Sequence, residues 1–398
     1  MINLIKSRMQ NFKPYVVARE IKRILSDNTD NQKVVSLSPQ EASRGTVLFS
    51  YIIDGLLLKP GQAVPNTHTN IWETIEIAKI FVDLGFSVDV ISYLNKTFIP
   101  QKPYYAILDV RDNLERLACL LGESCIKIMH LDTKNLLFQN LAEVKRLLEL
   151  QKRKGVTLRP RRFEIPNQSL ELAHCGITVG DSFTIETFQY AGKPIYSVPI
   201  PASFRMPWPE EKNFDKFRNH FLWFGSGGMV LKGLDLVLDA FAAMPECHLT
   251  VCGPVIDERD FVKLYHKELF ETSNIHTVGW MDVNSQKFQE IVNRCVATIF
   301  VSCSESGSAS SINCMHAALI PILSFETRMD TEDFGYILKC SSIEEIKDCV
   351  RRVAQLPTHE LIERSRKAWE YANENHTREK FKVAYRKVIE EIISIYGR

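Results

Sequence analysis

The sequence predicts an α/β protein of two domains, each built on a parallel sheet with helices on both faces. First, apolar segments rich in β-branched residues alternate with amphipathic helical segments along most of the chain, which is typical of repeated βα units. Second, 398 residues exceed what one hydrophobic core usually holds. Third, a stretch rich in proline and charge at 199–219 interrupts the alternation, which restarts after it.

The composition is that of an ordinary globular chain, with 45% hydrophobic and 24% charged residues. A net charge of +1 gives no indication of a nucleic-acid partner. No apolar run approaches the roughly 20 residues that span a bilayer, and the first residues lack a signal-peptide core, so we expect a cytoplasmic protein. The ten cysteines include no C-x-x-C pair. They are expected to be reduced, and no metal site is predicted.

Residues 1–44 look separate from the domain that follows. Over residues 1–25, basic side chains are interleaved with apolar ones, as in a basic amphipathic helix. Such a helix could lie on the inner surface of an anionic membrane, or it could pack on the protein's own flank with its basic face in water. Residues 26–44 are polar and predict a loop.

The first domain is predicted over 45–205, with strands at 45–53, 87–91, 105–108, 125–129, 177–179 and 195–198. Asn70 and Glu73 have capping-box spacing ahead of a helix that runs to about Leu84, where Gly85 stops it. A basic segment, which holds residues 151–154 with Arg159, Arg161 and Arg162, is either a solvated face or a contact for an anionic acceptor.

Two histidines of this domain fall at strand-to-helix junctions, where the crevice of a parallel sheet lies. His68 and Thr69 end the first loop, and His130 and Asp132 end a strand. A lone histidine is more often structural than functional, so both interpretations stay open. These four residues are the candidates for the acceptor side of a site.

A linker is predicted at 206–219 and a second α/β domain at 220–375. Its first strand, 221–224, runs into the turn formed by Gly225, Ser226, Gly227 and Gly228, and Lys232 begins the next helix. Glycines let a backbone approach an anion closely, and a lysine adds a positive charge. The spacing is not that of a Walker A loop.

A second anion-friendly turn lies at 304–311, between the strand at 296–301 and a helix. Its small residues leave the amides of the helix N-terminus open to an anion, and Glu305 could meet the neutral part of the same ligand. The alternative is an ordinary loop capped by serine. Further strands are expected at 248–253 and 275–279, so both turns lie at carboxyl ends that face one crevice. The segment 376–398 is predicted to be a helix with an apolar stripe.

With these residues in place, the chain resembles the family 4 glycosyltransferases, retaining nucleotide-sugar transferases of the GT-B fold. The resemblance is strongest over 221–356, where the glycine turn with its Lys-Gly pair and the segment 305–318 resemble two motifs of the family. It implies two Rossmann-like domains that face a crevice, with the last helix crossing back onto the first domain.

The resemblance also implies roles for single residues. Lys232 would bind the donor diphosphate, Glu305 would bond hydroxyls of the transferred sugar, and His130 would stand near the acceptor. Asn313 replaces the glutamate that grips the ribose, and Ser226 and Gly227 stand where the family has an arginine. The remaining donor contacts would come from Gly225, Gly228, Gly253, Ser306, Gly307, Ser308, Ala309 and Ser310.

The resemblance implies metal-independent, retaining transfer of a hexosyl group from a UDP- or GDP-linked sugar, with no cofactor. The acceptor would be a glycan or a lipid-linked chain in surface polysaccharide biosynthesis. Two other functions stay open, and the departures at Ser226 and Asn313 motivate the second of them. One is a nucleotide-sugar epimerase. The other is a non-catalytic binding or scaffold subunit of a polysaccharide assembly complex.

Overall fold

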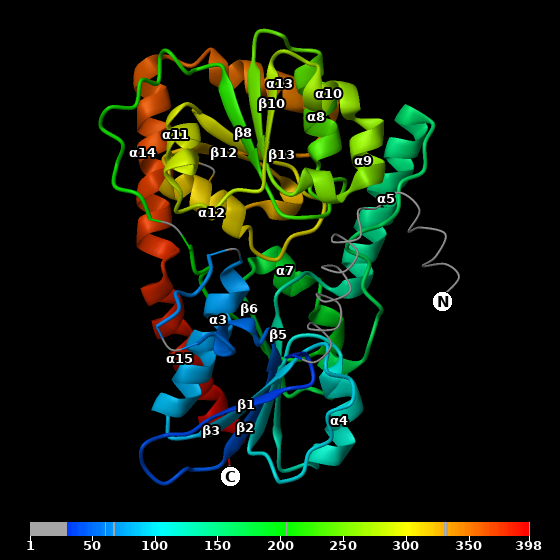
Figure 1. The fold of residues 1–398 in the computed structure, drawn as a ribbon, viewed down its shortest axis with the longest axis vertical. Helices are drawn as coiled ribbons and strands as arrows, with labels where there is room; N and C mark the ends of the chain where they lie inside the picture. The colour runs from blue at the N-terminus through cyan, green and yellow to red at the C-terminus, as the bar shows by residue number, and fades with distance from the viewer. Residues whose placement is uncertain are drawn as a thin grey trace.

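The computed structural model describes residues 30–59, 61–66, 68–203, 205–329, 331 and 333–397. The amphipathic helix predicted at 1–25 lies outside these residues, and its contact with a membrane stays a prediction. Two α/β domains lie one above the other, each with a twisted sheet between layers of helices (Figure 1). The predicted fold class is confirmed.

The first domain has a seven-stranded sheet in the order β1-β3-β2-β4-β5-β6-β7. Its strands are β1 (Val34–Leu37), β2 (Thr46–Tyr51), β3 (Ser87–Ser92), β4 (Ala106–Asp109), β5 (Ile126–Leu131), β6 (Cys175–Thr178) and β7 (Ile195–Ser197). All pairs are parallel except β1 with β3. The loop predicted at 26–44 is therefore wrong over β1. The side chains of Val35 and Leu37 alternate with exposed ones and pack onto the core, which favours a strand. It is an edge strand of the sheet.

Helices cover both faces of this sheet (Figure 1). They are α3 (Thr69–Asp83), α4 (Asn113–Leu121), α5 (Leu136–Lys154), α6 (Ser169–Leu172) and α7 (Ser182–Glu186), with short 3-10 turns η2 (Asp54–Leu56) and η3 (Gln189–Ala191). The predicted capping box at α3 is wrong. His68 is the N-cap, and its Nδ1 accepts from the Asn70 amide at 3.5 Å. Glu73 instead accepts a hydrogen bond from Tyr51.

The second domain has a fully parallel six-stranded sheet in the order β10-β9-β8-β11-β12-β13. Its strands are β8 (His220–Phe224), β9 (His248–Cys252), β10 (Ile275–Gly279), β11 (Ala297–Phe300), β12 (Ile320–Ser324) and β13 (Tyr336–Leu338). Its helices are α8 (Leu234–Ala242), α9 (Arg259–Leu264), α10 (His266–Phe270), α11 (Gln286–Asn293), α12 (Ala309–His316), α13 (Ile343–Ala354) and α14 (Thr358–Asn375), with η4 (Val255–Asp257) and η5 (Phe325–Thr327).

The last helix, α15 (Arg378–Tyr396), crosses back onto the first domain, as expected (Figure 1). Thr377 caps it by accepting a hydrogen bond from the Lys380 amide. Its apolar stripe joins the core of the first domain through Phe381, Tyr385 and Ile389. The two ends of the described chain therefore belong to the same domain.

Three cations of the basic segment at 151–162, namely Arg153, Lys154 and Arg161, pair with carboxylates of the second domain, whereas Lys152 and Arg159 are exposed. Arg153 donates to Asp235 of α8 at 2.6 Å, and Lys154 lies 2.6 Å from Asp239 of the same helix. Arg161 pairs with Asp260. The carboxyl end of α5 reaches the second domain. Arg153 and Lys154 in its last turn lie at the negative end of the α5 dipole and also pair with carboxylates of α8.

Candidate functional site

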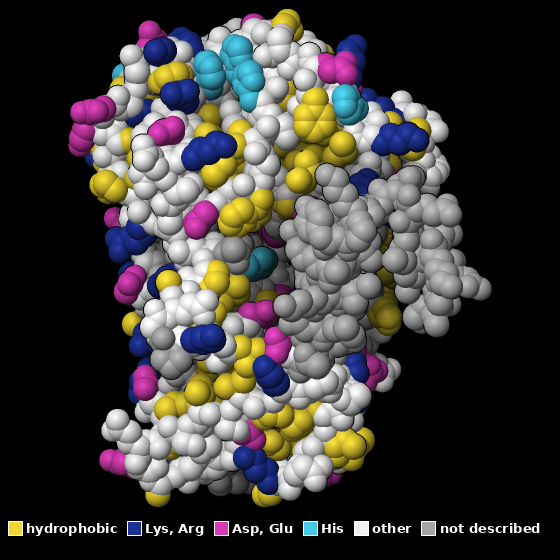
Figure 2. Space-filling model, in the orientation of Figure 1, with side chains coloured by type: hydrophobic (Ala, Val, Ile, Leu, Met, Phe, Trp, Pro, Cys, Tyr) yellow, Lys and Arg dark blue, Asp and Glu magenta, His cyan; other side chains and the backbone are white. Residues whose placement is uncertain are grey.

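The two sheets present their carboxyl ends to a shared crevice. Strand order reverses between β2 and β4 in the first sheet and between β8 and β11 in the second. Loops leaving neighbouring strands at such a point diverge and open a crevice. The cavity between the domains has a volume of about 290 Å³. In the space-filling view the surface is hollowed there (Figure 2). Predicted site residues that line it are His68, Thr69, Asp132, Gly225, Ser226, Lys232, Gly253, Glu305, Gly307, Ala309, Ser310 and Asn313.

Lys232 and Glu305 form an ion pair in the second-domain half of the crevice. The lysine Nζ lies 2.9 Å from Oε2 and 3.3 Å from Oε1 of the carboxylate. The Lys232 side chain is 5% exposed and that of Glu305 22%. The ammonium also lies 5.3 Å from the ring centroid of Phe300. An ammonium this buried needs a partner, and a phosphate could share it from the crevice.

The glycine turn is only partly available to a ligand. Gly225, Ser226 and Gly253 line the crevice, whereas Gly227 and Gly228 do not. The carboxylate of Glu258 accepts hydrogen bonds from the amide of Gly228 at 2.5 Å and from that of Met229 at 3.2 Å. This part of the turn is thus an anion cradle that an acidic side chain of the chain itself occupies.

The N-terminus of α12 points into the crevice. Ser308 is its N-cap and accepts from the Ser311 amide at 3.2 Å. Ser308 is buried and does not line the crevice, whereas Ala309, Ser310 and Asn313 do. The first turn of α12 therefore offers amides and the positive end of the helix dipole to an anion.

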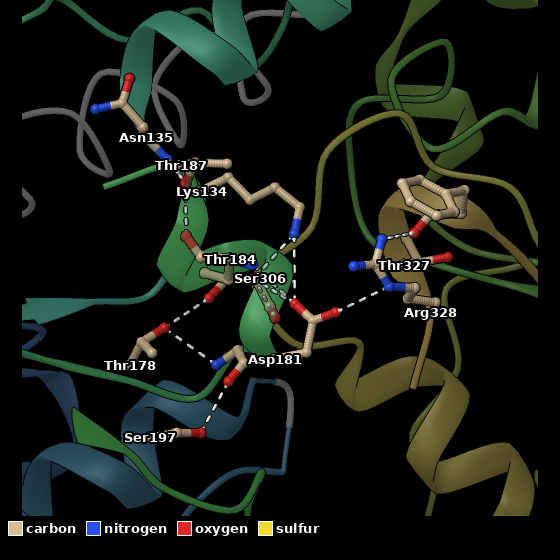
Figure 3. A network of polar contacts seen from close by, with 12 residues as sticks. Lys134, Asn135, Thr178, Asp181, Thr184, Thr187, Ser197, Ser306, Thr327 and Arg328 are labelled. Carbon is tan, nitrogen blue, oxygen red and sulfur yellow. Dashed lines mark hydrogen bonds and ion pairs between the residues drawn. The ribbon is translucent and has the colours of Figure 1, made fainter. Parts of the chain in front are cut away.

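Ser306, predicted as a donor contact, joins the domains instead. Its hydroxyl lies 3.1 Å from the Thr178 hydroxyl of β6, and its carbonyl accepts from Thr184 of α7 at 3.3 Å. Lys134 donates to the same threonine at 2.9 Å (Figure 3). The adjacent Gly307 has no room for a side chain, because an added Cβ would lie 2.7 Å from the Val179 carbonyl oxygen. The 304–311 turn is thus an interdomain contact as well as one wall of the crevice.

On the first-domain side, Asp132 forms a nearly buried ion pair with Arg111. The guanidinium counteracts burial, so the pKa of Asp132 lies below its ordinary value although the group is desolvated. His68 lines the rim, and burial together with the positive charge of Arg162 lowers its pKa. At neutral pH this wall therefore carries an ionised carboxylate, compensated by arginine, and a neutral imidazole.

His130 does not line the crevice. It lies on the face of β5 that α15 covers, and its Nδ1 lies 3.2 Å from the Tyr385 hydroxyl. Its Nε2 lies 3.9 Å from Oε2 of Glu73. Burial lowers the pKa of His130 to about 4 and raises the pKa of Glu73 to about 7. The imidazole is therefore neutral. It contacts Glu73 and Tyr51, and these two residues line the crevice.

Several lining residues escaped the sequence analysis. Trp280, half exposed, stands with Met281 and Val283 after β10 and gives the second-domain wall an aromatic and apolar patch. A tryptophan directly after the strand-ending Gly279 was the available signal. Arg162, named above in the basic segment as a possible contact for an anionic acceptor, also lines the crevice, apart from the paired cations of that segment.

Within the described residues, no group of three His, Cys, Asp or Glu side chains is placed to hold a metal ion. A search of the same residues for a helix long and apolar enough to cross a membrane finds none.

No protein-family model matches this sequence, and no curated protein matches it. Solved structures do share its architecture. Anabaena HepE in complex with UDP and glucose is 13% identical, with a TM-score of 0.55 over 88% of this chain and 100% of that one. Sucrose-phosphate synthase from Thermosynechococcus elongatus is 10% identical, with a TM-score of 0.62 over the same shares.

WaaG, described as a glycosyltransferase involved in lipopolysaccharide biosynthesis, is 12% identical, with a TM-score of 0.56 over 89% of this chain and 100% of that chain. Sequence identities this low support a shared fold and no shared activity or substrate. The similarity extends over both domains, because each alignment covers nearly nine tenths of this chain. The chain therefore has the GT-B fold.

Proposed function

We propose that the protein is a glycosyltransferase that moves a hexosyl group from a UDP- or GDP-linked sugar to a glycan or lipid-linked acceptor. The observation that carries the proposal is the Lys232–Glu305 pair beside the N-terminus of α12, at the carboxyl ends of the second sheet. The second-domain wall thus offers an ammonium and helix amides to a phosphate. It also offers the carboxylate of Glu305 to sugar hydroxyls. HepE, which shares the architecture, holds UDP and glucose.

The donor would lie along the second domain. Its base would rest against Trp280, Met281 and Val283, and its ribose near Asn313, whose amide can bond a hydroxyl. Its diphosphate would lie between Lys232 and the first turn of α12. Transfer breaks the bond from the sugar C1 to the diphosphate oxygen, so negative charge grows on the departing phosphate. Lys232 and the helix amides are in place to stabilise that charge without rearrangement.

The acceptor would enter from the first domain, where Asp132, His68 and Thr69 line the opposite wall. His130 would act as a positioning residue, because its ring packs behind Tyr51 and Glu73 rather than in the crevice. Retention of configuration, metal independence and a role in surface polysaccharide biosynthesis belong to the proposal through the family resemblance. WaaG, of the same architecture, is described for lipopolysaccharide biosynthesis.

Thermal unfolding in the presence of a chelator tests the proposal, with UDP, GDP, ADP and dTDP as separate ligands. A diphosphate at about one hundred times its dissociation constant should stabilise the folded protein by about 2.7 kcal/mol. We expect UDP or GDP to raise the melting temperature, and the corresponding nucleotide sugar to be consumed when an acceptor is supplied. Melting curves that none of the four diphosphates shifts would rule the proposal out.

A second candidate is a non-catalytic scaffold subunit of the same architecture. One observation favours it: Glu258 already occupies the amides of Gly228 and Met229, which a donor phosphate would otherwise use. A scaffold would show no diphosphate-dependent stabilisation, so the same measurement separates the two functions.

A further inference from the structure

One of the cations that line the crevice has no ion-pair partner in the described part of the chain. Three cations with fixed charge line it in the described part of the chain: Arg111, Arg162 and Lys232. Arg111 is paired with Asp132, and Lys232 with Glu305. Among the described residues, the Arg162 guanidinium has neither a carboxylate nor a hydrogen-bond acceptor. Of the three cations, Arg162 is therefore the one without an ion-pair partner among the described residues, and it belongs to the first domain.

The backbone of Arg162 is held firmly in place. Its amide donates to both carboxylate oxygens of Glu143, at 3.1 and 3.2 Å, and its carbonyl accepts from Gln139 at 2.7 Å. Both partners lie on α5 and are buried. A buried carboxylate and a buried amide thus fix the point from which this arginine extends, while its half-buried side chain points into the crevice.

The side chain of Arg162 reaches across the domain boundary to the glycine turn. A Cβ added at Gly228 would lie 2.8 Å from its Cγ and 3.4 Å from its Cδ, so the glycine leaves the space in which the arginine stem lies. Its charge is also felt at His68 on the rim, where it contributes to the lowered pKa. The guanidinium is therefore placed between the rim of the first domain and the turn that leads to Lys232.

We infer that Arg162 binds the diphosphate of the nucleotide donor, as the second cation beside Lys232; this rests on the proposed function. Lys232 is already paired with Glu305, whereas a nucleoside diphosphate carries at least two negative charges. Arg162 supplies the missing charge, and its planar fork can bond two phosphate oxygens at once. Because it extends from the first domain, donor binding also ties the two domains together.

Calorimetric titration of the full chain tests this inference, with UDP and GDP as ligands and with uridine and guanosine as their phosphate-free counterparts. The variants are Arg162→Gln, Arg162→Lys and the control Arg159→Gln, which removes an exposed arginine from the same segment. For Arg162→Gln we expect the Kd of the bound diphosphate to rise about tenfold or more, as for a lost charge-assisted hydrogen bond, while nucleoside binding is unchanged. The diphosphate Kd of Arg162→Lys should lie between those of the wild type and Arg162→Gln. The Kd of Arg159→Gln should equal that of the wild type.

Two outcomes would overturn the assignment of Arg162: a diphosphate Kd in Arg162→Gln equal to that of the wild type, or a loss of nucleoside affinity as large as the loss of diphosphate affinity. The second would mean that the variant has changed the shape of the crevice. The melting temperatures of Arg162→Gln and Arg162→Lys are also measured without ligand. A lower melting temperature in Arg162→Gln alone identifies a folding defect. If the wild type binds neither diphosphate, the proposed function is wrong and the assignment falls with it.

Discussion

Lys232 Nζ lies 2.9 Å from Oε2 of Glu305, and the two residues come from different βα units of the second domain. Lys232 lies between β8 and α8, and Glu305 lies after β11. The strands β8 and β11 are the neighbours at which the strand order reverses. The pair thus marks the centre of the donor half of the crevice. Its two members should have separable effects on binding and transfer.

Replacing Lys232 by alanine should remove most of the stabilisation that a nucleoside diphosphate gives. The phosphate loses its nearest ammonium and faces Glu305, whose carboxylate is then unpaired. At the ligand excess that stabilises the wild type by about 2.7 kcal/mol, a hundredfold weaker ligand would add only about 0.4 kcal/mol. Differential scanning fluorimetry with and without the diphosphate measures this. An undiminished ligand-induced shift in Lys232→Ala would show that the phosphate binds elsewhere.

Glu305→Gln should separate binding from transfer. The variant frees Lys232 from its carboxylate, so the bare diphosphate should bind at least as tightly as in the wild type. Contacts to the sugar hydroxyls lose their charge, and we expect kcat for sugar transfer to fall about a hundredfold, the loss of an interaction worth about 2.7 kcal/mol. Diphosphate Kd and the transfer rate are measured on the same preparation. A large loss of diphosphate affinity would assign Glu305 to the phosphate instead.

Trp280→Ala should weaken the binding of the free nucleoside. The half-exposed indole offers an aromatic face to a base, and such stacking is worth about 1–3 kcal/mol. Titration with uridine and guanosine gives the change in Kd. Tyr190→Ala, which removes an exposed aromatic ring from the first domain, is the matched control. Equal nucleoside affinity in both variants would place the base away from Trp280.

Glu73→Gln should stabilise the ligand-free protein at alkaline pH. Burial raises the pKa of Glu73 from its ordinary 4.5 to about 7, so the folded state holds a proton that the unfolded state releases between these values. The contribution of this carboxyl is fully present below pH 4.5 and is lost as pH rises through 7. Glutamine cannot ionise, and the variant should be more stable by about 1–3 kcal/mol at pH 8.

Melting temperatures of wild type and Glu73→Gln at pH 5 and pH 8 measure the difference. It should nearly vanish at the lower pH, where both proteins are neutral at this position. A variant that is less stable than the wild type at both values would mean that Glu73 is ionised and well paired in the folded state.

Arg153→Met should destabilise the protein by about 3 kcal/mol, because it removes the cation that is hydrogen-bonded to the fully buried Asp235. The double variant Arg153→Met, Asp235→Asn should lose less than the sum of the two single changes. Urea unfolding at pH 7 gives the free energies of unfolding. Lys367→Met, which breaks an exposed pair with Glu363, is the control and should change stability by less than about 0.5 kcal/mol. An Arg153→Met protein as stable as this control would contradict an interdomain role for the pair.

The sequence alone determined the fold class, most strands, the last helix and part of the second-domain wall. These follow from local patterns, because buried parallel strands are continuous apolar runs and the loops after them carry the turn chemistry. Lys232, Glu305 and Gly307 were therefore predictable one by one. The edge strand β1 was not, since four residues in a polar segment give a weak signal.

Only the tertiary structure decided which of these residues share a space. His130 and Asp132 lie two positions apart, yet one faces α15 and the other the crevice, because β5 ends between them. Ser306 turns to the partner domain, Glu258 occupies the glycine turn, and Arg162 reaches the crevice while Arg161 pairs outside it. Each outcome depends on a contact between segments far apart in the chain. Local propensity carries no information about such contacts, whereas burial and charge pairing fix them once the domains meet.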